Sequence, residues 1–345
     1  MITSLSISNV TELEDRLSRP SDRTVETLAN LSGDVLVLGA GGKMGPSFAR
    51  MARRALGSGG RRRRVIAVSR FRDIQARSSL QAVDVEVLAG DLMDPRFVES
   101  LPECENVVYL AGTKFGTQGQ EATTWATNAY MPGVVCRRFA GSRIACLSTG
   151  NVYGLITARA VHGSREDDEL KPLGEYAMSC LGRERVVEYF SRKQQTPVSI
   201  IRLNYATELR YGVLVDLAQR VYREEPIALD MGYFNVIWQA DACNMTLCSL
   251  NHANSPPAIF NVTGPTVIRC RDVCERFGEL LGKPVQFVGV ESPSALLSDA
   301  RRTCDTLGAP ETPLDDMIHW TAEWVSAGGE NWGKPTHFEV RDGKF

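Results

Sequence analysis

The segment from Gly39 to Gly45 constrains the fold of this chain more than any other stretch. It reads Gly-Ala-Gly-Gly-Lys-Met-Gly, at the end of the apolar run DVLVLGA and at the start of a helical pattern that reaches Leu56. In such a strand–turn–helix unit the first glycine permits a tight turn, the second lets the backbone approach a pyrophosphate, and the third lets the helix pack on the sheet. The N–H groups and the helix dipole favour an anion there. The segment therefore predicts a dinucleotide-binding loop rather than a plain tight turn, with these contact residues: Gly39, Gly42, Lys43, Met44 and Gly45.

Strand and helix patterns alternate from residue 34 to residue 203. Short apolar runs that are typical of buried parallel strands occupy residues 34–40, 64–70, 85–91, 106–112, 143–149 and 198–203. Helical patterns lie between them, including TTWATNAYMPGVVCRRF and GEYAMSCLGRERVVEYF. Such alternation implies right-handed crossovers and a doubly wound parallel sheet. The predicted fold class is therefore α/β, a Rossmann-type sheet with a smaller C-terminal substrate lobe.

The length of 345 residues suggests two domains, or one large domain with an elaborated lobe. We expect an N-terminal extension over 1–30 and a NAD(P)-binding domain over 31–203, with a returning segment at about 235–262. Residues 204–345 are expected to form mainly the substrate-binding lobe and the C-terminal tail. The tail is rich in glycine and polar residues, and it is expected to be either an ordered wrap or a flexible end.

Charge and cysteine usage exclude several classes of function. The formal net charge is −2, so no overall positive field recruits nucleic acid or a membrane surface. No stretch offers the ~20 apolar residues that a membrane span needs. The nine cysteines and four histidines are scattered without the spacing of a metal site, so none is predicted. Cysteines in apolar stretches indicate buried, reduced thiols and hence a cytoplasmic protein.

The end of the second predicted strand bears on the choice of cofactor. An NAD site usually has an acidic residue here to bind the ribose hydroxyls. This chain has Ser69 and Arg70, which supply the hydrogen-bond donors and the positive charge that suit a 2′-phosphate. We therefore expect NADP or NAD, with NADP favoured. The alternative for Arg70 is that it stacks on the adenine or faces solvent.

Several later segments resemble the extended short-chain dehydrogenase/reductases, the family of NAD(P)-dependent sugar epimerases and dehydratases. GDLMD is similar to a Gly-Asp-Leu segment of that family, which implies that Asp91 meets the adenine amine and that Leu92 lines the adenine pocket. YLAG is similar to the end of the family's fourth strand, which implies that the backbone passes close to the cofactor at two residues, Ala111 and Gly112.

The same resemblance supplies an active site. LSTGNVYG places Thr149 where the family has its catalytic serine or threonine, and EYAMSC places Tyr176 where it has its catalytic tyrosine. Asn128 lies where family members have a helix asparagine near the active site. The resemblance implies an NAD(P)-dependent oxidoreductase, epimerase or dehydratase that acts on a sugar, sugar acid or nucleotide sugar by reversible hydride transfer. It also implies a homodimer.

One residue departs from the family. A lysine normally follows the tyrosine by four positions, binds the nicotinamide ribose and lowers the pKa of the tyrosine, but here that position is Cys180. A neutral thiol carries no charge, and a thiolate would raise the pKa of a nearby tyrosine. Three interpretations remain open. Lys114, at the carboxyl edge of the predicted sheet, supplies the charge, and Arg183 points past the site or pairs with an acid. Alternatively, the protein is a non-catalytic dinucleotide-binding regulator or scaffold, or Cys180 is itself a nucleophile or redox thiol.

Overall fold

A seven-stranded parallel sheet forms the centre of the molecule. The computed structural model describes residues 6–57, 63–114, 119–158 and 162–344. The order of the strands is β12-β7-β5-β4-β1-β2-β3, and every neighbouring pair is parallel. The strands are β1 (Val35–Leu38), β2 (Val65–Ser69), β3 (Glu86–Ala89), β4 (Asn106–Tyr109), β5 (Arg143–Thr149), β7 (Val198–Leu203) and β12 (Ala258–Val262). This confirms the Rossmann-type α/β fold predicted from the alternating pattern.

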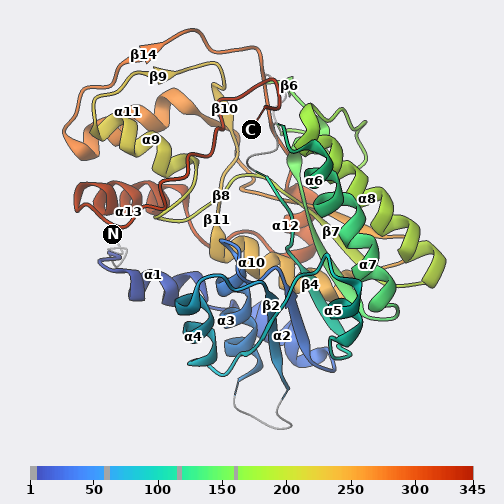
Figure 1. Cartoon of the computed structure of the whole chain (residues 1–345). Helices are drawn as coiled ribbons and strands as arrows, with labels where there is room; N and C mark the ends of the chain where they lie inside the picture. Colours follow the sequence, from blue (N-terminus) through green and yellow to red (C-terminus); the bar gives the residue numbers. More distant parts are fainter. Residues whose placement is uncertain (1–5, 58–62, 115–118, 159–161, 345) are drawn as a thin grey trace.

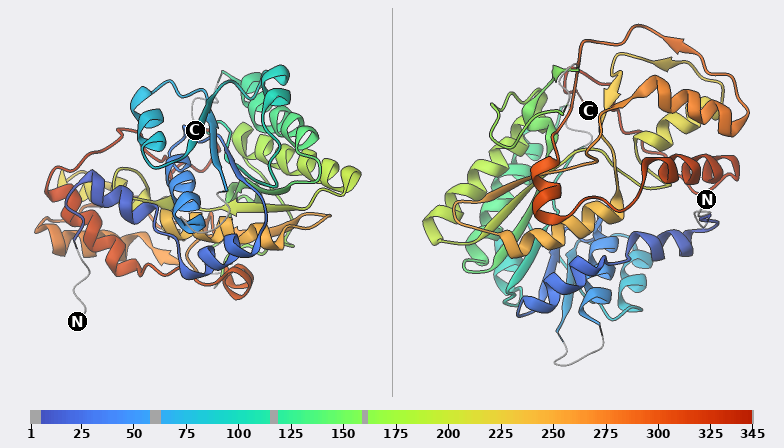
Figure 2. Two further views of the ribbon diagram at one scale, coloured as in Figure 1. Left: turned by 90° about the horizontal axis from the view of Figure 1, so that it is seen from below. Right: turned by 180° about the vertical axis from the view of Figure 1, so that it is seen from behind.

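Both faces of the sheet are covered by helices (Figures 1 and 2). The side chains of β1 alternate between them, because successive residues of a strand point to opposite faces. Val35 and Val37 pack in one core with α2, α3 and α10, whereas Leu36 and Leu38 pack in another with α5, α7 and α8. The helices are α2 (Asp22–Asn30), α3 (Gly45–Leu56), α4 (Ile74–Gln81), α5 (Pro95–Ser100), α6 (Glu121–Trp125), α7 (Met131–Arg138), α8 (Gly174–Gln194) and α10 (Gln239–Cys248). Burial on both faces explains why the strands are uniformly apolar.

The strand order reverses between β1 and β4. From β1 the chain moves outward through β2 and β3, and then returns to the other side of β1 and moves outward through β4, β5, β7 and β12. At such a switch point the loops after two adjacent strands diverge, which leaves a crevice at their carboxyl ends. The glycine loop after β1 and the segment after β4 border this crevice.

A smaller lobe stands over the carboxyl edge of the sheet. Its three helices, α9 (Val213–Tyr222), α11 (Cys270–Leu281) and α13 (Leu314–Ser326), pack on one another at the side opposite α6–α8 (Figure 1). Short strand pairs complete it: β6 (Ile156–Thr157) with β15 (Ser294–Ala295), β8 (Ala206–Thr207) with β11 (Ile237–Trp238), β9 (Ile227–Ala228) with β14 (Phe287–Val288), and β10 (Tyr233–Phe234) with β13 (Ile268–Arg269). The remaining short helices are α12 (Arg301–Leu307), η2 (Gly150–Tyr153) and η3 (Ser249–His252).

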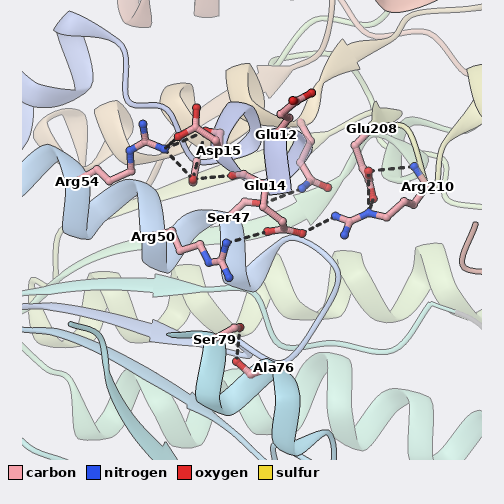
Figure 3. Close-up of polar contacts among 12 residues, drawn as sticks. Glu12, Glu14, Asp15, Ser47, Arg50, Arg54, Ala76, Ser79, Glu208 and Arg210 are labelled. Carbon is pink, nitrogen blue, oxygen red and sulfur yellow. Dashed lines mark hydrogen bonds and ion pairs between the residues drawn. The ribbon is translucent and has the colours of Figure 1, made fainter. Parts of the chain in front are cut away.

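The N-terminal helix α1 (Val10–Leu17) connects the glycine-loop helix to the smaller lobe (Figure 3). Its Glu14 forms ion pairs with Arg50 of α3 at 3.4 Å and with Arg210 of the lobe at 2.7 Å. Leu13 and Leu17 of the same helix are fully buried. Residues 1–5 of the predicted extension lie outside the described residues, but its two helices are part of the core.

The C-terminal tail is an ordered wrap, which decides between the two alternatives that the sequence leaves open. Trp332 stacks on Tyr211, with ring centroids 6.2 Å apart. Thr336 donates to Asp216 of α9 from its amide and its hydroxyl, at 2.7 and 2.6 Å. Phe338 is buried. The tail therefore crosses the smaller lobe and returns to the central crevice.

All nine cysteines are free thiols and eight are buried, as the apolar sequence around them indicates. No helix within the described ranges is long and apolar enough to cross a membrane.

Candidate active site

A cavity of about 350 Å³ lies at the carboxyl edge of the sheet, where the sheet meets the smaller lobe. The predicted site residues that line it are Gly39, Gly42, Lys43, Met44, Gly45, Gly112, Lys114, Thr149 and Tyr176. The smaller lobe, the β7 end and the tail add residues including Asn204, Tyr205, Tyr211 and Thr336. The glycine loop and the predicted catalytic pair therefore open into one cavity.

The geometry of the glycine loop suits a bound dinucleotide. Gly39 has φ +91, and a β-carbon there would lie 2.7 Å from the amide nitrogen of Ala111, so the turn and the end of β4 approach closely. A β-carbon at Gly45 would lie 2.3 Å from the carbonyl oxygen of Ala40. At Gly42 the nearest atom would be the Gly39 carbonyl oxygen at 3.3 Å, a tight but single contact, and the residue lines the cavity. A glycine at this point would leave room for an approaching phosphate.

Two lysines contribute positive charge to the cavity. The ammonium of Lys43 lies 3.0 Å from the ring centroid of Tyr211. Burial lowers the pKa of Lys43 to about 7, and repulsion from Lys114 and Lys334 adds to the effect. Burial also lowers the pKa of Lys114 to about 8. A bound anion would stabilise the charged form of both amines.

Tyr176 and Thr149 come together from different elements. Tyr176 lies in the first turn of α8, Thr149 ends β5, and both residues line the same cavity. Tyr176 also packs in one cluster with Cys180, which is buried one turn further along α8. Burial raises the pKa of Tyr176 above its ordinary value, Cys180 raises it further, and the charge of Arg183 lowers it. Burial also raises the pKa of Cys180, so a neutral thiol faces the tyrosine at neutral pH.

Asn128 lies in a π-helical turn, η1 (Ala126–Tyr130), between α6 and α7. The sequence predicts one continuous helix here. The structure differs because Pro132 has no N–H, so it cannot donate to the carbonyl of Asn128 four residues before it. The Asn128 side chain accepts from the amide of Thr113 at 2.8 Å and donates to Ser179 of α8 at 3.0 Å. Asn128 thereby joins the β4 end to the tyrosine helix.

Arg183 corrects a prediction. The sequence suggests that it points past the site or pairs with an acid, but its side chain lines the cavity. Its guanidinium donates to the carbonyl oxygens of Leu147 at 2.7 Å and Asn128 at 3.1 Å, and to the side-chain oxygen of Asn128 at 2.8 Å. It takes this path because a helical side chain leans toward the N-terminus of its helix, which brings a long residue back over the preceding turns.

A buried ion pair supports the site from behind. Arg202 of β7 and Glu184 of α8 are 2.8 Å apart, and both are almost fully buried. Ser148, next to Thr149, donates to Glu184. Glu166 is the buried member of an acidic run over 166–169 whose other three residues are exposed, and it accepts from the amide of Asn261 at 3.1 Å.

The residues predicted to bind the adenine half of the cofactor lie outside this cavity. Ser69 ends β2 beside the glycine loop, where a β-carbon at Gly41 would lie 2.7 Å from its hydroxyl. Arg70 is exposed, as is Asp91, whose carboxylate accepts from the amide of Met93 at 3.0 Å, and Leu92 is buried. Their contacts with a nucleotide stay predictions. Within the described residues, no group of three or more His, Cys, Asp or Glu is placed to hold a metal ion.

Sequence reasoning missed several residues of the cavity. For Arg183 the sequence does contain a signal: Pro132 has no N–H, so the carbonyl of Asn128 is left able to accept a hydrogen bond from another donor. Tyr211 and Thr336 had none, because they reach the cavity only through the packing of the lobe and the tail.

Comparisons with known proteins agree with this architecture. A model of the NAD dependent epimerase/dehydratase family matches residues 35–262. Among solved structures, MoeE5 in complex with UDP-glucuronic acid and NAD has a TM-score of 0.70 at 20% identity, covering 86% of this chain and 100% of that one. The dTDP-glucose 4,6-dehydratase of Bacillus anthracis, in complex with NAD, has a TM-score of 0.71 at 15% identity, covering 86% and 97%.

The UDP-glucose 4-epimerase of Thermotoga maritima, with UDP-glucose, has a TM-score of 0.69 at 18% identity, covering 86% and 99%. Likenesses at these identities show a shared fold. No curated protein matches the sequence.

Proposed function

The chain belongs to the NAD-dependent epimerase/dehydratase family, and on this premise we propose that it is an NAD(P)-dependent enzyme that acts on a sugar, sugar acid or nucleotide sugar. The observation that carries the proposal is the single cavity that brings the glycine loop, Thr149 and Tyr176 together. The reaction would be oxidation at a carbinol followed by epimerisation, elimination or reduction.

The residues of the cavity fit a bound dinucleotide. Gly42 leaves its side of the loop open, and the start of α3 presents N–H groups and a positive dipole end to a pyrophosphate. Ser69 and Arg70 stand at the end of β2 without an acidic residue, which supports NADP alongside NAD. A nicotinamide cofactor held there would supply reversible hydride transfer.

Tyr176 and Thr149 would perform the proton chemistry. Thr149 holds the reacting hydroxyl of the substrate, and Tyr176 takes its proton and gives it back. Thr149 lines the cavity together with Tyr176, and Asn128 fixes the helix that holds the tyrosine through its bond to Ser179.

The charge of the cavity supports an acidic substrate. Lys43 and Lys114 line it together, and their lowered pKa values reflect burial that a bound anion would offset. One similar structure holds UDP-glucuronic acid, which carries a carboxylate besides its diphosphate. We therefore place sugar acids and their nucleotide derivatives first among the candidate substrates.

The experiment combines identification of the cofactor with a substrate panel. Nucleotide released from the purified protein is identified by mass spectrometry, and turnover is measured on nucleotide sugars paired as neutral hexose and uronic acid. We expect bound NAD or NADP, turnover of the acidic member of a pair, and a loss of about 10²–10⁴-fold in Tyr176→Phe, the usual contribution of a general acid–base.

The control is Tyr189→Phe, an exposed residue of the same helix, which should keep full activity. One observation favours a second candidate, because Cys180 replaces the family's lysine. If the protein holds stoichiometric cofactor but turns over no member of a broad panel, the function is that of a non-catalytic regulator or scaffold.

A further inference from the structure

Arg183 is a buried cation without a carboxylate partner among the described residues. Its side chain donates to two backbone carbonyls and one amide oxygen, all of them neutral acceptors. The neighbouring carboxylate, Glu184, is paired instead with Arg202. Burying a guanidinium without an opposite charge costs free energy of folding, so the presence of Arg183 at this position needs an explanation.

The surrounding fold is built to hold this group. A β-carbon at Gly112 would lie 2.3 Å from the Arg183 guanidinium, so only glycine leaves the space that it fills. Pro132 leaves the carbonyl of Asn128 without a helical donor, and that carbonyl accepts from Arg183. Features of β4, η1 and α7 therefore converge on one guanidinium.

The charge of Arg183 acts on the tyrosine end of α8. It lies three residues after Cys180 on the same helix face, and it lines the same cavity as Tyr176. Its positive charge lowers the pKa of both Tyr176 and Cys180, opposing the effect of burial. A nearby cation favours the phenolate in this way because it stabilises the charged form.

Lys114 is a weaker candidate for the same task. It lines the cavity, but burial lowers its pKa to about 8, so its charge is partly lost just above neutral pH. An arginine keeps its charge throughout this range.

We propose that Arg183 is the fixed cation that stabilises the tyrosinate form of Tyr176, in place of the lysine whose position Cys180 occupies. It is a positioning residue that acts through Tyr176 by its charge, and the proposal rests on the proposed function. The cation would then come from the seventh position after the tyrosine instead of the fourth, from a side chain that lines the same cavity.

The first test is the pH dependence of turnover in Arg183→Gln, Arg183→Lys and Lys114→Met. Removing the cation should shift the acidic limb of the profile upward by about 1–2 pH units, because the base form of Tyr176 then needs a higher pH. Arg183→Lys should shift it less, and Cys180→Lys/Arg183→Gln should bring it back. A limb that moves in Lys114→Met and stays in Arg183→Gln would overturn the proposal in favour of Lys114.

The second test needs no substrate, so it separates this proposal from the proposed function. Thermal unfolding is compared in Cys180→Lys, Arg183→Gln and the double variant. Two cations beside one tyrosine repel, so Cys180→Lys should lower the melting temperature, and adding Arg183→Gln should recover most of that loss. Additive losses would mean that the two positions share no site, which refutes the idea. If Arg183→Gln does not fold, Arg183→Met replaces it. If neither variant regains stability when Cys180→Lys is added, the proposal is likewise refuted.

Discussion

Lys43 is the cation that stands in the glycine loop itself, and its protonation should be coupled to ligand binding. Its pKa is lowered from 10.5 to about 7, so above that pH the amine is largely neutral in the free protein. A bound pyrophosphate or carboxylate would raise this pKa, because an opposite charge favours the ammonium. Binding therefore takes up a proton in the pH window between the two values.

The expected result is that affinity for NAD or NADP falls as pH rises from about 7 toward the ordinary lysine range near 10.4. Calorimetry in buffers of different ionisation enthalpy measures the proton uptake directly. Lys43→Met should remove most of it, whereas Lys193→Met, at an exposed position of α8, should leave it unchanged. Proton release, or a pH-independent affinity, would contradict this account of Lys43.

Among the individual residues of the cavity, some positions were predicted correctly from the sequence and others were not. Thr149 and Tyr176 were predicted as a pair, and the structure brings both to the lining of one cavity. Their catalytic roles stay predictions. The spacing alone does not give the direction of Arg183, because a separation of seven residues along a helix fixes a distance between backbones but not the path of a long side chain.

In the glycine loop and at the start of helix α3, different glycines are expected to matter for stability and for cofactor binding. Gly45 packs against the backbone of Ala40, which cannot move aside cheaply, whereas Gly42 has only one atom near its missing side chain. We expect Gly45→Ala to lower the free energy of unfolding by about 1–3 kcal/mol through overpacking. Gly42→Ala should keep stability but weaken cofactor binding about tenfold or more, since its methyl group occupies the path of the phosphate.

Urea unfolding and calorimetric titration with NAD and NADP measure the two effects on the same samples. Gly141→Ala is a poor control, because the φ of Gly141 is +88 and an added side chain would strain the backbone there. Ala122→Gly in α6 is used instead, because it exchanges the same two residue types away from the loop without crowding any neighbour. If Gly42→Ala unfolds as readily as Gly45→Ala, the loop owes its glycines to packing alone.

Most elements follow from the sequence, whereas their local irregularities do not. The apolar runs predict six of the seven strands of the central sheet, since burial on both faces leaves a clear pattern, whereas β12 lies outside the alternating region. The π-helical turn at Asn128 interrupts a helix whose apolar period is otherwise continuous. Pro132 explains the missing hydrogen bond, but periodicity alone does not show whether a proline ends, kinks or widens a helix.

At the scale of the whole molecule, the two ends of the chain meet at the same junction. Arg210 accepts a hydrogen bond from the tail at Trp332 and forms ion pairs with Glu14 of α1 and with Glu208 (Figure 3). The residue after it, Tyr211, covers Lys43. Contacts between positions 14, 210 and 332 follow from tertiary packing, so no sequence pattern could reveal that both ends stabilise the wall of the cavity.

The surface formed by α6, η1 and α8 should be the interface of a homodimer, and this expectation has a direct test. It exposes four large apolar side chains, Trp125, Tyr130, Met178 and Tyr189. Met178 and Tyr189 are eleven residues apart, three helical turns, and so share one face.

Light scattering should give twice the chain mass for the wild type and a shift toward the monomer for Tyr189→Glu. Tyr222→Glu, exposed on α9 of the other lobe, should stay dimeric. A wild-type monomer would leave these apolar residues to another partner, and a dimer that tolerates Tyr189→Glu but not Tyr222→Glu would place the interface on the smaller lobe.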